Sequence, residues 1–272
     1  MLRYLIASVG FNNAVRYVTT VNAITAIVAV LLAVPSTSHQ FRKPEKWLSK
    51  RVWVDTSAFR DASFCWFTAS IAALFLGFYC VFFSLEEWAA VTGIAYKGKP
   101  PPGVTRGLST YWLLSIMNAC STFGRLSSAW LCDHFGALNV HMTVTLVSSL
   151  LCLILWTLAR SLAPALVFAI VFGMFSGSVI GLPPASMAAI LGPEPHRQAR
   201  LGQWTGMMYT AAAPFALIGP VISGHLITAY ETFLTVQIWS GLCLFLSAVC
   251  MAMAIHYGRR KNKLEQRDEE QV

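Results

Sequence analysis

The residue whose type and position most clearly suggest chemistry is Arg125. It lies toward one end of an apolar stretch, Leu108 to Cys132, that contains no other Asp, Glu, Lys or Arg. A charged side chain within a bilayer costs about 2.5–3.5 kcal/mol, so it usually faces a polar cavity, a partner or a substrate. Because a guanidinium can grip a carboxylate through two parallel hydrogen bonds, Arg125 is a candidate binding group for an organic anion.

A structural role for Arg125 is the open alternative. The side chain could pair with Asp133 of the same helix, or extend its charged end to the lipid headgroups. Asp133 stands three residues before Gly136, in a segment that reads as the turn to the next helix. Sequence alone does not choose between the structural role and the anion-binding role.

The elements that must position Arg125 are membrane-spanning helices. Hydrophobic residues make up 56% of the 272 positions and charged residues 12%, against about 25% charged in soluble proteins. The chain also contains several charge-free stretches longer than the roughly 20 residues that cross a hydrocarbon core. We therefore expect an all-α integral membrane protein, with the lipid bilayer as its first partner.

Other classes of function find little support in the sequence. The net charge of +8 comes from basic residues placed between apolar spans, so it indicates membrane topology rather than nucleic-acid binding. The seven cysteines form no CxxC or Cys/His cluster, and we expect no metal site, cofactor or disulfide. No hydrolase, zinc-protease or phosphate-loop motif is present, so we do not expect an enzyme.

Seven spans are predicted from the apolar stretches, at residues 14–34, 62–84, 109–131, 138–159, 162–184, 204–228 and 234–256. We divide the chain into a leading segment with the first span (1–34), a central loop (35–61), a six-helix bundle (62–256) and a polar tail (257–272). The tail is expected to be frayed or disordered.

The orientation follows from the distribution of basic residues. The segments 35–60, 193–200 and 258–272 would share one side, with 13 Lys and Arg residues, and the opposite side would hold six. The richer side is cytoplasmic by the positive-inside rule. We therefore predict a cytoplasmic C-terminus and, with seven spans, an N-terminus on the other side.

Glycine spacing predicts where helices pack closely. Gly173, Gly177 and Gly181 recur every four residues and so share one helix face, which allows a neighbouring backbone to approach. Pro183 and Pro184 are expected to break that helix. Gly219 and Pro220 lie within another predicted helix and are expected to make it flexible. Such helices suit a protein whose parts shift against each other, although ordinary tight packing explains the same pattern.

Taken in order, these segments resemble the C-terminal half of a major facilitator superfamily transporter, from helix six to helix twelve, of the fungal monocarboxylate-transporter-like branch. The resemblance rests on the following residues: Leu5–Pro35, Phe59–Phe64, Tyr111–Ala119 with Phe123–Arg125, Asp133–Gly136, Gly173–Gly177 with Leu182–Pro184, and Ile218–Gly224.

The resemblance implies a helical bundle of the major facilitator type that transports a small organic solute. In animal members, an Asp and an Arg four residues later on helix eight serve proton coupling and carboxylate binding. Arg125 matches the Arg, but Ser121 stands at the Asp position, which puts proton coupling through this pair in doubt. We expect Arg125, Ser121 and Asn118 to bind the substrate, a small organic anion with or without a proton. We expect Asp133 and Gly136 to act in inner-loop gating, although the family's loop signature is only partly present.

The family has twelve helices around a central cavity, and this chain corresponds to one half plus one helix. The leading interpretation is a truncated secondary transporter in the plasma or vacuolar membrane. A non-transporting membrane partner, pairing with a complementary transporter half, is the alternative. A seven-helix receptor is a remote third possibility.

Overall fold

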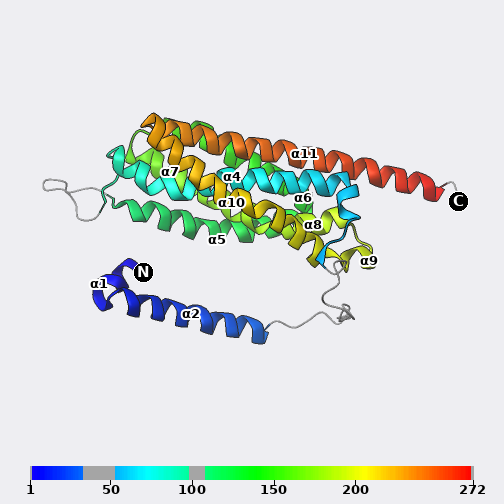
Figure 1. Ribbon diagram of the computed structural model, residues 1–272, viewed down its shortest axis with the longest axis horizontal. Helices are drawn as coiled ribbons and strands as arrows, with labels where there is room; N and C mark the ends of the chain where they lie inside the picture. Colours follow the sequence, from blue (N-terminus) through cyan, green and yellow to red (C-terminus); the bar gives the residue numbers. More distant parts are fainter. Residues whose placement is uncertain (1, 33–52, 98–107, 271–272) are drawn as a thin grey trace. The chain divides into compact units, whose positions relative to one another are not determined.

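The structure is a computed structural model, and it describes residues 2–32, 53–97 and 108–270 (Figure 1). The chain divides into two units, residues 1–45 and 46–272, each of which is described by itself. The first unit contains the short helix α1 (Leu2–Val9) and the 22-residue apolar helix α2 (Phe11–Leu32). Helix α2 covers the predicted first span (14–34) as far as Leu32, and the rest of that span and residues 35–52 of the predicted central loop lie outside the described residues.

The second unit is a bundle of long helices. After the short helix η1 (Ala58–Arg60), its elements in chain order are α4 (Ala62–Val91), α5 (Thr110–Phe135), α6 (Ala137–Leu150) with its π-helical continuation η2 (Leu151–Trp156), α7 (Leu162–Gly181), α8 (Pro183–Leu191), α9 (Pro195–Gln198), α10 (Leu201–Tyr230) and α11 (Leu234–Glu270). Each of the seven predicted spans is thus helical over most of its described length, and the span predicted at 162–184 is divided between α7 and α8. Within the described residues, six helices are long and apolar enough to cross a membrane, and α5 is the predicted span that is not among them.

The bundle is arranged around α4, which packs against both α10 and α11, while α5 packs against α7 and α6 joins the two groups (Figure 1). Aromatic rings fill part of the interior: Trp156 stacks on Phe168 with ring centroids 5.4 Å apart, and Phe168 stacks on Phe172 at 5.1 Å. Large apolar side chains such as Leu217 and Val221 of α10 remain more than 70% exposed, as expected for a surface that meets lipid.

Serine hydroxyls join helices across the bundle. Ser70 of α4 and Ser247 of α11 lie 3.0 Å apart at their hydroxyls, and Ser84 of α4 and Ser223 of α10 lie 3.1 Å apart. Ser178 of α7 donates to the carbonyl oxygen of Gly124 in α5 at 2.8 Å. These contacts are the interhelical hydrogen bonds that hold helices together in lipid, where apolar burial provides little driving force.

The prediction of a frayed or disordered tail was wrong. Helix α11 continues beyond the apolar span to Glu270. The tail is rich in Lys, Arg, Gln and Glu, which are strong helix formers, so a helix that begins in the membrane extends readily through it. An ion pair of 2.7 Å between Lys261 and Asp61 also ties the start of this extension to the start of α4.

Candidate functional site

Helix α5 carries the candidate site, and its residues divide it into three faces. The helix begins after Ser109, which has an extended backbone, and ends at Gly136, where φ is +81° and the N–H bonds to the carbonyl oxygen of Cys132. That φ is strained for residues with a side chain, so glycine suits the tight turn into α6.

The first face is buried and consists mainly of small residues. Leu113, Met117, Ser121, Gly124 and Ser128 recur every three or four positions and lie on the buried side of α5. A Cβ atom on Gly173 of α7 would lie 2.5 Å from the carbonyl oxygen of Met117, and one on Gly177 would overlap the carbonyl oxygen of Ser121. The backbones of α5 and α7 therefore touch along this face.

The second face is polar and exposed. Its members repeat at helical spacing along the length of α5: Tyr111, Ser115, Asn118, Thr122, Arg125 and Asp133. The third face, next to it around the helix, is exposed and apolar, with Trp112, Phe123, Leu126 and Trp130 between 48% and 69% exposed. The polar face makes α5 less apolar than the other long helices, and such a face needs a polar environment within a membrane.

Arg125 lies on the polar face with its side chain exposed. Asp133 is two helical turns further on, about 12 Å along the axis, and the structure shows no ion pair of either residue with the part of the chain that it describes. The proposed structural pairing of Arg125 with Asp133 is therefore not present. Gly181 of α7 leaves room for the Arg125 stem, because a Cβ there would lie 3.9 Å from its Cγ.

The two other residues predicted to bind substrate lie on different faces. Asn118 is exposed on the polar face seven residues, or about two helical turns, before Arg125. Its amide donates to the carbonyl oxygen of Leu114 at 2.9 Å. Ser121 is 9% exposed and faces α7, with its hydroxyl donating to the carbonyl oxygen of Asn118 at 2.7 Å. Asn118 thus shares the polar face with Arg125, about 10 Å away along the helix axis, whereas Ser121 is part of the helix contact.

The remaining predicted positions lie at helix contacts and helix ends. Asp133 is exposed in the last turn of α5, directly before the Gly136 turn. Pro183 is buried and Pro184 exposed at the first two positions of α8, where α7 has just ended. Gly219 packs against the backbone of Leu76 in α4, and Pro220 beside it is half-buried within α10.

Several polar contacts between helices could not be predicted from the sequence. The buried ring of His141 lies 3.0 Å from the Ser186 hydroxyl, linking α6 to α8. With its amide oxygen turned toward the two indoles, buried Gln237 accepts hydrogen bonds from Trp88 at 3.2 Å and Trp156 at 3.3 Å. Partners this far apart along the chain leave no local pattern to find.

A further polar cluster lies before α4, where Asp55 accepts hydrogen bonds from Trp204 at 3.0 Å and from Arg200 at 3.2 Å. Burial alone would raise the pKa of Asp55, but hydrogen bonds from Ser57 and Trp204, together with the charge of Arg200, lower it overall. Across the described ranges, no three His, Cys, Asp or Glu residues are grouped in a way that could hold a metal ion.

The chain is similar in sequence to several fungal transporters and in fold to a solved transporter structure. No family model matches the chain. It is 29% identical over 248 residues to the aspyridones efflux protein apdF of Emericella nidulans, covering 90% of this chain and 45% of that protein. It is 25% identical to the MFS-type transporter dbaD of the same organism, covering 94% of this chain and 53% of the relative. It is also 25% identical to the agnestins efflux protein AgnL12 of Paecilomyces divaricatus, covering 89% and 52%.

The chain spans about half the length of the curated relatives that it matches. Among solved structures, it is similar to the fucose:proton symporter FucP of E. coli, with a TM-score of 0.62 at 15% identity. That likeness covers 92% of this chain and 58% of the symporter. At this identity the match concerns the fold, which is that of a helical membrane bundle.

Proposed function

This chain belongs to the major facilitator superfamily, and from that premise we propose that it takes part in moving a small organic anion across a membrane. The observation that carries the proposal is the exposed polar face of α5, with Arg125 and Asn118 on it. A permanently charged guanidinium that has no ion pair among the described residues is suited to a carboxylate ligand.

The chain matches only about half the length of its relatives, so we propose which half of a complete transporter it corresponds to. In major facilitator proteins the substrate cavity lies between two six-helix halves, and we propose that this chain is the C-terminal half preceded by helix six. The polar face of α5 would then line the cavity, and the apolar face of α5 beside it would be in contact with lipid. The names of two relatives contain the word efflux, which favours outward transport. We propose that the chain acts in the plasma or vacuolar membrane, and the distribution of Lys and Arg favours a cytoplasmic C-terminus.

The test joins the chain to a complementary N-terminal segment of five helices, which completes a twelve-helix form, and measures uptake or efflux of an organic anion together with protein abundance. Arg125→Lys keeps the charge but loses the planar fork, so transport should weaken. Arg125→Ala should abolish transport while leaving the protein in the membrane. Arg160→Ala is the matched control, because Arg160 is an exposed cation outside α5. Full transport by well-expressed Arg125→Ala would remove the residue from the mechanism.

The second candidate is a non-transporting membrane partner, and the half-length match favours it. In that case the tight α5–α7 contact is structural, and the chain acts by associating with another half or with a complete transporter. Purification of a stable complex that binds the anion only through the partner's residues would support this candidate. Transport that depends on Arg125 would exclude it.

A further inference from the structure

At one end of the bundle, three basic segments far apart in the sequence meet around one cavity. The cavity has a volume of about 620 Å³ and is lined by the segment before α4, the α8–α10 connection and the start of the α11 extension. Its cationic side chains come from all three segments: Arg60, Arg197, Arg200, Arg260 and Lys261. Asp61 is the acidic residue in its lining.

Three of these five cations are already neutralised. Lys261 pairs with Asp61 at 2.7 Å, Arg200 with Asp55 at 3.2 Å, and Arg197 with Glu194 at 3.0 Å. Within the described part of the chain, neither Arg60 nor Arg260 has an ion pair, and both side chains are exposed. Two guanidinium groups therefore face one cavity with their charges uncompensated, an arrangement suited to a phosphate group.

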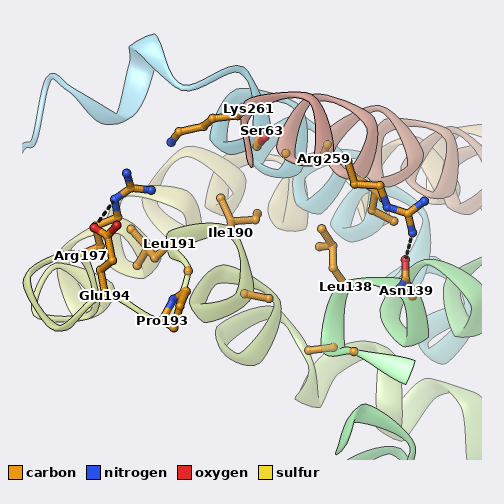
Figure 2. Close-up of a pocket in the computed structure, with 17 residues that line it drawn as sticks. Ser63, Leu138, Asn139, Ile190, Leu191, Pro193, Glu194, Arg197, Arg259 and Lys261 are labelled. Carbon is orange, nitrogen blue, oxygen red and sulfur yellow. Dashed lines mark hydrogen bonds and ion pairs between the residues drawn. The ribbon is translucent and has the colours of Figure 1, made fainter. Parts of the chain in front are cut away.

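The walls of the cavity are partly apolar. Ile190 and Leu191 line it, with the aromatic rings of Trp204 and Tyr257 beside them. Ile190 and Leu191 also line a neighbouring cavity of about 400 Å³, in which Arg197 and Arg259 stand on opposite sides (Figure 2). A ligand that fits both the charges and these walls has an anionic head and an apolar body.

The position of the cavity identifies the source of such a ligand. Its lining includes Ala62, where the α4 span begins, and Lys261, where the α11 span ends, and α10 begins beside it at Leu201. The cavity thus lies where the spans meet water, which is the level of lipid headgroups. Basic pockets between helices at this level bind anionic lipid headgroups.

We propose that this cavity binds the phosphate-bearing headgroup of an anionic phospholipid, with Arg60 and Arg260 as its main ligands. The chemistry recognised is a phosphate anion, and the lipid supplies it together with an apolar chain that lies against Ile190 and Leu191. The proposal does not depend on transport, because the site lies away from the polar face of α5.

The test uses the purified full chain in detergent and follows binding of short-chain phosphatidylserine by native mass spectrometry and by the rise in melting temperature. Each charge removed near the headgroup should weaken binding roughly fivefold, so Arg60→Gln with Arg260→Gln should weaken it about twenty-five-fold. Arg160→Gln removes the same charge elsewhere and should leave binding unchanged. Without lipid, all variants should melt at the wild-type temperature, because both arginines are exposed and unpaired with any described residue.

Two further probes identify the source of the anion. Phosphatidylcholine of the same chain length, which has no net charge, should bind much more weakly than phosphatidylserine. Inorganic phosphate should give little stabilisation, because it lacks the apolar body. Equal binding by the double variant, equal binding of phosphatidylcholine, or equal stabilisation by inorganic phosphate would each overturn the proposal.

Discussion

The backbone of Ser121 in α5 touches Gly177 in α7 so closely that no side chain fits between them. One turn away, Gly173 of α7 makes the same kind of contact with the backbone of Met117 in α5. In the reciprocal contact the glycine is on α5: Gly124 lies against the backbone of Met174 in α7. The two helices therefore interlock through glycines on both sides. Gly181, on the same face, lies beyond this contact and is exposed.

Gly177→Ala should destabilise the bundle, because its Cβ would overlap backbone atoms that cannot move independently. Overpacking of this kind costs about 1–3 kcal/mol. Gly181→Ala is the matched control, since its nearest new contact is 3.9 Å away on a flexible side chain. Thermal melting in detergent should separate the two variants, and equal melting temperatures would show that α5 and α7 do not pack in this way.

Asp55 should make the heat stability depend on pH. Because its pKa is lowered in the folded chain, its contribution is complete above the ordinary value of about 3.9 and is lost as the pH falls through the lowered pKa. Asp55→Asn should therefore be less stable than wild type at neutral pH and approach it in acid. Asp133→Asn, at an exposed carboxylate without an ion pair in the described structure, is the control. A constant gap between Asp55→Asn and wild type across this range would contradict the argument.

The predicted orientation can be checked by cysteine labelling. Thr232 lies in the turn between α10 and α11, and Arg267 lies near the end of α11. We expect Thr232→Cys to react with an impermeant maleimide in right-side-out vesicles, and Arg267→Cys only after permeabilisation. The background replaces Cys65, Cys120 and Cys132, the native cysteines that are not buried. Reaction of both positions from the outside would contradict the predicted orientation.

The faces of α5 predict different reactivity in a twelve-helix form. Asn118→Cys and Thr122→Cys lie on the polar face and should react with a hydrophilic thiol reagent, and the transported anion should slow the reaction. Phe123→Cys lies on the apolar face, where lipid would exclude the reagent. Similar rates at all three positions would mean that the polar face does not line a cavity.

The helices could be predicted from sequence because a span requires a long charge-free stretch, and charges mark its ends. The predicted span at 204–228 and helix α10 at Leu201–Tyr230 differ by only a few residues for this reason. The tail helix was missed because polar composition does not distinguish a disordered segment from an extension of a helix that already exists.

The candidate site was predictable in part. Arg125 stands out because a charge in an apolar stretch is costly, and its exposure on a polar face agrees with that reasoning. Ser121 lies only about 40° from Arg125 around the helix, so sequence could not tell which face it joins. The close contact with Gly177 decides this, and the choice depends on α7, which lies more than 40 residues further along the chain.

During synthesis α5 leaves the ribosome before α7 exists, so it reaches the translocation machinery without the helix that covers its small-residue face. Its polar face makes it less apolar than the six helices that are apolar enough to span a membrane, so its insertion is more costly. The short turn at Gly136 delivers the more apolar α6 immediately afterwards. Helix α5 is therefore expected to enter the bilayer as a hairpin with α6, and to become stable there only once α7 has been translated.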